Sequence, residues 1–151
     1  MNLDRYRLKA SEDLISFEFI SVGPKGRIPK MIQFTPTNYN SHNLSFGNKD
    51  PETGRIDDLA ISNNGDSDRI LATVVATVYA FTDKYPDAWV YAAGSTKART
   101  RLYRMGISKY WEEAKNDFHI LGQLNDEWEP FVIGIDYDAF VVKRKLRNFE
   151  L

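Results

Sequence analysis

The 151-residue sequence contains no cysteine. This absence excludes a disulfide framework, a zinc site with thiolate ligands and a cysteine nucleophile, and it suits a reducing cytoplasm. The sequence also has no apolar run of the roughly 18 residues that a membrane-spanning helix needs. Its first residues lack the basic and apolar regions of a signal peptide. We therefore expect a cytoplasmic protein that has no membrane partner.

Histidine and net charge are also scarce. The two histidines, His42 and His119, lie far apart in the sequence, which argues against a zinc site in a chain without cysteine. The phosphate-binding motif G-x-x-x-x-G-K-[ST] and the nucleophile motif G-x-S-x-G are both absent. We therefore expect neither a metal nor a cofactor. The formal net charge of −1 at pH 7 argues against a general nucleic-acid binder.

Two pairs of aspartates remain as candidates for metal or acid–base chemistry. Asp57 and Asp58 are neighbours in an expected strand, so their side chains point to opposite faces and cannot both line one site without a β-bulge. Asp136 and Asp138 share a face, but the sequence offers no third ligand. Neither pair predicts a metal site.

The composition is that of a folded protein. Apolar residues make up 42% and aromatic residues 13% of the chain, which is enough for a packed core. The length fits one domain, and we expect residues 1–151 to form it.

Alternating apolar residues and Gly/Pro turns predict two β-hairpins in the first part of the chain, and apolar residues at helical spacing predict helices later. One expected helix covers residues 66–84, with Asp66 as its N-cap, and another covers 96–118, interrupted at Gly106 and capped again by Ser108. The expected strands cover residues 6–8, 14–20, 28–34, 44–47, 56–61, 88–93, 120–124 and 131–145. The order, roughly ββββ-α-β-α-ββ, indicates an α+β fold with an antiparallel-rich sheet, two helical segments packed on one face, and strand 88–93 in the centre.

The most informative segment is residues 94–104, which directly follows the apolar run 88–93. It predicts a strand that turns at Gly94 into a helix whose first turns carry four cations and no acid. A helix start exposes unpaired N–H groups and a partial positive charge, so added cations are unfavourable there unless an anion joins them. Hydroxyl and guanidinium groups suit such an anion. The candidate anion- or ligand-binding residues are Ser95, Thr96, Lys97, Arg99, Arg101, Tyr103 and Arg104.

These residues do not form one cluster on the expected helix. At about 100° per residue, the side chains of Lys97, Arg101 and Arg104 share one stripe, and those of Arg99 and Tyr103 share another. A third stripe is apolar and is expected to be buried; it consists of Ala98, Leu102 and Met105. The alternative to a binding site is a capped surface helix whose cations pair with Glu112, Glu113 or the acidic block 126–138.

Several short segments together resemble a family of small uncharacterised proteins from Bacteroidetes-type bacteria. The residues that carry this resemblance are 43–47, Asp57-Asp58, 63–66, 94–103 and 137–140, of which 94–103 is the most specific. The resemblance covers most of the chain. It implies a bacterial cytoplasmic origin and transfers no catalytic residue.

Three hypotheses follow for function. The first is a non-catalytic binding module that takes a phosphate-bearing ligand, such as RNA or DNA, at the start of the basic helix. The second is a small ribonuclease of the kind found in toxin modules, with Tyr103 or His119 working beside the arginines. The third is an interaction partner whose basic helix docks on an acidic protein surface.

Overall fold

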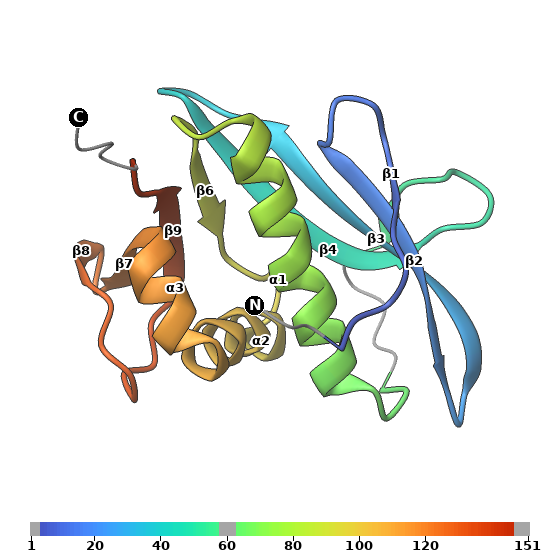
Figure 1. Ribbon diagram of the computed structural model, residues 1–151. Coiled ribbons are helices and arrows are strands. Elements are labelled where there is room, and N and C mark those ends of the chain that lie inside the picture. Colours follow the sequence, from blue (N-terminus) through green and yellow to red (C-terminus); the bar gives the residue numbers. More distant parts are fainter. Residues whose placement is uncertain (1–3, 58–62, 147–151) are drawn as a thin grey trace.

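The computed structural model describes residues 4–57 and 63–146, which form one twisted β-sheet with helices on one of its faces (Figure 1). The strands are β1 (Lys9–Ala10), β2 (Ser16–Gly23), β3 (Gly26–Pro36), β4 (Ser41–Lys49), β5 (Ile56–Asp57), β6 (Trp89–Ala92), β7 (Phe118–Leu124), β8 (Glu127–Pro130) and β9 (Ala139–Arg144). The helices are α1 (Ser67–Lys84), α2 (Lys97–Lys109) and α3 (Trp111–Asp117).

The strand order in the sheet is β1-β2-β3-β4-β6-β9-β7-β8, and β5 pairs with the end of β4. Neighbouring strands are antiparallel except β4 and β6, which run parallel, with Leu44 opposite Ala92. α1 makes the connection between them. The expected α+β class, the antiparallel-rich sheet and the central position of β6 are therefore confirmed.

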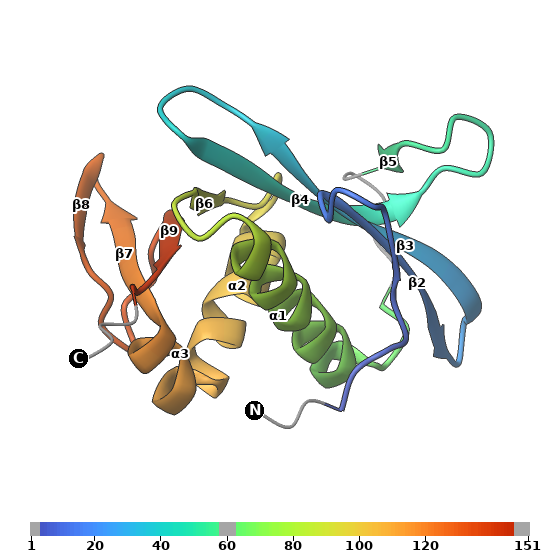
Figure 2. The ribbon, with the colours of Figure 1, turned by 45° about the horizontal axis from the view of Figure 1, so that its top comes forward.

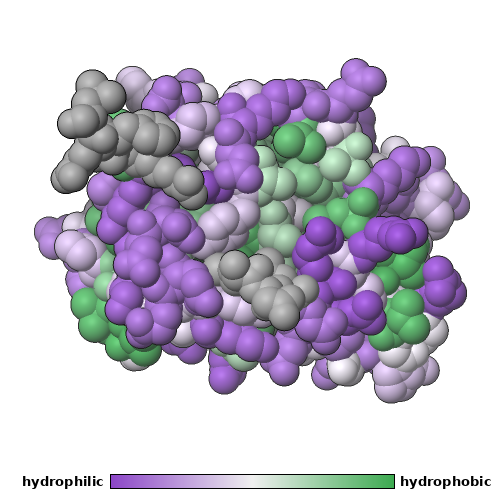
Figure 3. Space-filling model, in the orientation of Figure 1, coloured by the Kyte–Doolittle hydropathy of each residue, from purple (hydrophilic) through white to green (hydrophobic). Residues whose placement is uncertain are grey.

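The helices cover the inner face of the sheet, and the core lies between the two layers (Figure 2). Strand alternation decides which side chains enter it: Phe17 and Phe19 of β2, and Ile32 and Phe34 of β3, are buried at no more than 3% exposure. Phe34 stacks on Phe81 of α1 with ring centroids 4.3 Å apart. Hydrophobic residues also show at the surface beside α1, between larger hydrophilic areas (Figure 3).

α1 begins after Asp66, as expected, but the Asp66 carboxylate does not cap it. Its Oδ2 instead accepts hydrogen bonds from the hydroxyls of Tyr6 and Ser21, both at 2.5 Å. Tyr6 lies in the segment before β1, and its backbone N–H donates to Thr73 Oγ1 of α1 at 3.0 Å. The expected strand at residues 6–8 is therefore wrong, because this segment is tied to α1 and pairing with β2 begins only at Lys9.

The second helical region breaks at Tyr110 rather than at Gly106. Gly106 lies inside α2, where a Cβ at this position would meet Leu71 and Val75 of α1, and Ser108 lies in the same helix rather than at a start. Gly106 allows α1 and α2 to approach each other closely. From the sequence alone, a glycine with this role cannot be distinguished from one that ends a helix.

The apolar stripe expected on this helix is also wrong. Ala98 and Met105 are exposed and Leu102 is half-buried, whereas Tyr103 and Gly106 are buried. α2 thus packs through the face that carries Tyr103, because a large aromatic ring and a glycine fit the space between α1 and the sheet.

The last expected strand begins too early. Residues 131–138 form a loop in which Phe131 is buried while Val132 and Ile133 are half exposed, at 50% and 52%. β8 begins at Glu127 and pairs with β7 after a turn at Asn125 and Asp126. Of the expected strand 56–61, residues 58–61 lie outside the described part of the chain, as does Asp58. In the described ranges, no helix has the length and apolar character needed to cross a membrane.

Candidate functional site

The turn from β6 into α2 is built as the sequence predicts. A Cβ on Gly94 would lie 2.4 Å from Arg99 Cβ and from the Thr100 nitrogen, so only glycine fits this close approach. The Gly94 N–H donates to Thr100 Oγ1 at 2.9 Å. Thr96 is the N-cap, and its Oγ1 accepts a hydrogen bond from the Arg99 N–H at 3.2 Å. The strand end and the helix start are thus held as one unit.

The cations of α2 point in different directions. Lys97 and Arg101 are exposed, and neither forms an ion pair within the part of the chain that the structure describes. Arg104 is ion-paired, with its Nη1 2.8 Å from Asp136 Oδ1. The alternative of pairing with the acidic block therefore applies to Arg104 among these three.

Arg99 turns inward, away from that exposed stripe. Its guanidinium carbon lies 5.1 Å from the centroid of the Phe46 ring, and its Nη1 donates to the Phe46 carbonyl oxygen. Tyr103, on the same side of α2, is buried at 7% exposure and faces the core. The structure thus brings Arg99 to β4 and leaves Tyr103 without access to a ligand on the exposed stripe.

A second cation reaches Phe46 from the sheet, and the sequence reasoning missed it. Lys30 of β3 is 4% exposed, and its Nζ lies 5.8 Å from the Phe46 centroid and donates to Asn48 Oδ1 at 2.5 Å. Burial lowers the pKa of the Lys30 ammonium, and the charge of Arg99 lowers it further, while Asp66 opposes this shift. The signal was in the sequence: Lys30 is in phase with the inward-facing Ile32 of the expected strand.

The place where these groups meet is the carboxyl end of the parallel pair β4 and β6. Leu44 of β4 is opposite Ala92 of β6, and the two strands run parallel. The residues that follow them therefore lie at the same end of the two strands: Phe46 to the end of β4, and Gly94 and Ser95 after β6. Carboxyl ends of neighbouring parallel strands are a common position for ligands, and here a helix start adjoins them. We call Lys30, Phe46, Asn48, Ser95 and Arg99 the strand-end site.

The histidine of the ribonuclease hypothesis lies elsewhere. His119 is exposed on β7 between Phe118 and Ile120, both of which are buried toward the helices, so His119 faces the opposite side of the sheet. It therefore does not meet Tyr103 or the arginines of α2. Asp136 and Asp138 are both exposed, and the described residues contain no group of three or more histidines and carboxylates that would hold a metal ion.

Comparison with known proteins gives a family and no activity. No curated protein and no solved structure matches the chain. The model of a family of unknown function, DUF6934, matches residues 2–145, nearly the whole chain. The resemblance to an uncharacterised family is therefore confirmed at this level, and the chain belongs to DUF6934.

Proposed function

We propose that the protein is a non-catalytic binding module that takes a phosphate-bearing ligand at the strand-end site. The observation that carries this proposal is the convergence of two cations, Lys30 from β3 and Arg99 from α2, on one aromatic ring. Burial is the main cause of the lowered pKa of Lys30, and the nearby positive charge of Arg99 lowers it further, so the two cations disfavour each other. An anion placed between them reverses this effect.

The surroundings of the two cations suit a phosphate group. Arg99 has further N–H groups besides the one that it donates to Phe46, and guanidinium forks bind phosphate oxygens in pairs. Ser95 and Thr96 are exposed hydroxyl residues at the start of α2, where the partial positive charge of the helix favours an anion. Lys97 is an exposed cation in the first turn and adds attraction at the rim.

The cellular setting is part of the same proposal. A chain without cysteine suits a reducing compartment, and the resemblance to small bacterial proteins favours the cytoplasm of a Bacteroidetes-type bacterium. A phosphate-bearing ligand in that setting is a nucleotide, a phosphorylated metabolite or a nucleic acid, which share the group that this site would bind.

Pyrophosphate, titrated by calorimetry at low salt, tests the proposal. Lys30→Met and Arg99→Met keep an apolar stem and remove the charge, so each is expected to weaken binding about tenfold or more, since a hydrogen bond to a charged group contributes about 1.5–3 kcal/mol. Arg104→Met is the matched control, because Arg104 lies on the same helix but pairs with Asp136, and it is expected to leave affinity within about twofold. Absence of binding to the wild-type protein, or equal losses in all three variants, would refute the proposal.

A further inference from the structure

A concave region lies along β1, β2 and β3 and reaches Lys30 of the strand-end site. A groove of about 770 Å³ lies between the segment before β1, strands β2 and β3, and the turn after β4. This volume is in the usual range of ligand sites. Its lining includes one acid, Glu18, among the residues that the structure describes, and six cations: Arg7, Lys9, Arg27, Lys30, Lys49 and Arg69.

Most of this positive charge is not neutralised. Lys49 is ion-paired with Glu18. Arg7, Lys9 and Arg27 are exposed, and none of them is within ion-pair distance of a carboxylate in residues 4–57 and 63–146. Arg69 stacks on the ring of Tyr6, with its guanidinium carbon 4.2 Å from the ring centroid, which fixes that cation at the groove.

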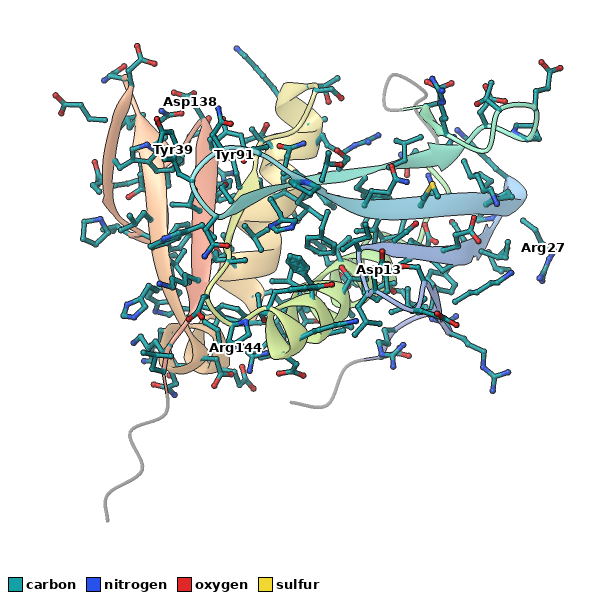
Figure 4. The ribbon with its side chains drawn as sticks, turned by 90° about the horizontal axis from the view of Figure 1, so that it is seen from above. Asp13, Arg27, Tyr39, Tyr91, Asp138 and Arg144 are labelled. Atoms are coloured by element: carbon teal, nitrogen blue, oxygen red, sulfur yellow. The ribbon has the colours of Figure 1, made fainter. Side chains whose placement is uncertain are left out.

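The local fold explains why the groove exists. β1 pairs with β2 over only two residues, Lys9 and Ala10. Further along the same edge of β2, the Val22 N–H donates instead to the Tyr6 hydroxyl at 3.0 Å. Val22 follows the buried Ser21 on β2, so its side chain faces the other side of the sheet, where it is 47% exposed and lines the groove. Arg27 is opposite Val22 on β3, and Figure 4 shows it reaching outward at the end of the molecule.

The spacing of the cations favours an extended anion over a single one. Lys9 is opposite Glu18 and Arg27 is opposite Val22, and these two positions of β2 are four residues apart, or about 13 Å along the strand at about 3.3 Å per residue. One phosphate group cannot reach both ends, whereas a chain of phosphate groups can, because single-stranded nucleic acid carries one charge per nucleotide. Apolar residues such as Ile20 and Pro29 line the rest of the groove and offer surface to bases and sugars.

We infer that this groove is a second anion-binding site, which shares only Lys30 with the strand-end site, and that it takes a chain of phosphate groups such as single-stranded nucleic acid. No aromatic side chain with an exposed ring lines it in the described residues, since Tyr6 and Phe19 are buried. Recognition therefore rests on phosphate contacts, and it is tolerant of sequence and strongly dependent on salt.

The test measures the fluorescence anisotropy of a labelled single-stranded oligonucleotide at salt concentrations from about 50 to 200 mM, a range over which affinities that depend on phosphate contacts fall steeply. The double variant Lys9→Gln/Arg27→Gln changes two exposed side chains and leaves the core intact. We expect it to weaken binding about tenfold at the lower salt and to reduce the slope of log K against log salt by about 1.4, or about 0.7 for each lost contact. Lys84→Gln/Lys145→Gln removes the same charge from exposed positions outside the groove and is expected to keep the wild-type slope.

Competition identifies the ligand class. Displacement of the oligonucleotide by inorganic polyphosphate is expected, because recognition rests on the phosphate chain, and failure of polyphosphate to displace it would overturn the inference. Equal displacement by polyglutamate would overturn the inference in favour of an acidic polypeptide. Wild-type affinity in Lys9→Gln/Arg27→Gln, or no binding by the wild-type protein, would overturn it as well. Pyrophosphate binding by this double variant distinguishes the groove from the strand-end site, whose residues it leaves unchanged.

Discussion

Gly106 is a position where the structure predicts that a single methyl group stabilises the protein. It lies inside α2, where glycine costs about 1 kcal/mol relative to alanine. A Cβ added there would lie 3.5 Å from Leu71 Cδ2 and 3.7 Å from Val75 Cγ2, both ordinary contact distances. An apolar cavity of about 80 Å³ adjoins the position, between α1, α2 and the sheet, so the methyl group enters space that is already empty.

The expected gain follows from these two contributions. The helix contribution is about 1 kcal/mol and the burial of one carbon contributes up to about 0.8 kcal/mol, so Gly106→Ala is expected to raise the free energy of unfolding by about 1–2 kcal/mol. For a chain of this length, that corresponds to a rise in Tm of about 2–8 °C. Urea unfolding followed by circular dichroism measures the change, with an unaltered m-value as the sign that the folded and unfolded states are otherwise the same.

Two other glycines serve as controls for the reasoning. At Gly122 an added Cβ would lie 2.5 Å from the Tyr137 ring, so Gly122→Ala is expected to destabilise the protein. At Gly134 there is open space, but the φ of 95° disfavours alanine, and a loss of about 1 kcal/mol is expected. Destabilisation by Gly106→Ala would contradict this prediction, because it would mean that the added methyl group overpacks the contact between α1 and α2.

Three further predictions concern buried polar groups. Burial lowers the pKa of Lys30 in the folded protein below its value in the unfolded chain. Between these two pKa values the unfolded state binds more protons, so the free energy of unfolding rises with pH. Urea unfolding at several pH values up to about 10 should show a flatter rise in Lys30→Met than in the wild-type protein, and equal slopes of stability against pH would contradict the prediction. Burial likewise lowers the pKa of His42, which packs on Phe81 at 4.8 Å, so wild-type stability is lost as pH falls below about 6.5, and His42→Phe should lose less between pH 7 and 5. Tyr6→Phe removes the donor to Asp66 and is expected to cost about 1–3 kcal/mol in the same assay, with no measurable loss counting against the cluster.

The parts of the fold that local sequence determines were predictable. The β2–β3 hairpin follows from alternation around a Gly/Pro turn, and α1 follows from apolar spacing that survives its many β-branched residues. The segment 131–138 shows the limit of the same reasoning. Its alternation of Phe131, Ile133 and Ile135 is typical of a strand, but β7 pairs with β8 on one side and β9 on the other, so β7 has no free edge to offer this segment.

The strand-end site was only half predictable for a related reason. The sequence located the Gly94 turn, the Thr96 cap and the cations of α2, all of which are close together in the chain. The direction of Arg99 depends on Phe46, which is 53 positions earlier, and the approach of Lys30 depends on the pairing of β3 with β4. Such contacts between distant segments leave no local pattern. A lysine in phase with inward-facing residues was the one signal available.

The net charge of −1 is a poor guide to the charge of any one surface of this protein. Pairing between the basic block 97–109 and the acidic block 112–138 gives one ion pair in the described residues, Arg104 with Asp136, while Lys109 reaches Asp68 of α1 instead. Arg27 and Asp138 lie at opposite ends of the molecule (Figure 4). A chain of this length has a radius of gyration of about 15 Å, and the screening length at physiological salt is about 8 Å. Charges at one end are therefore screened from those at the other, and a polyanion at the groove would meet chiefly the charges of the groove itself, six cations and Glu18. A net charge near zero argues against nucleic-acid affinity over the whole surface, but it is compatible with a basic site that is confined to one part of the surface.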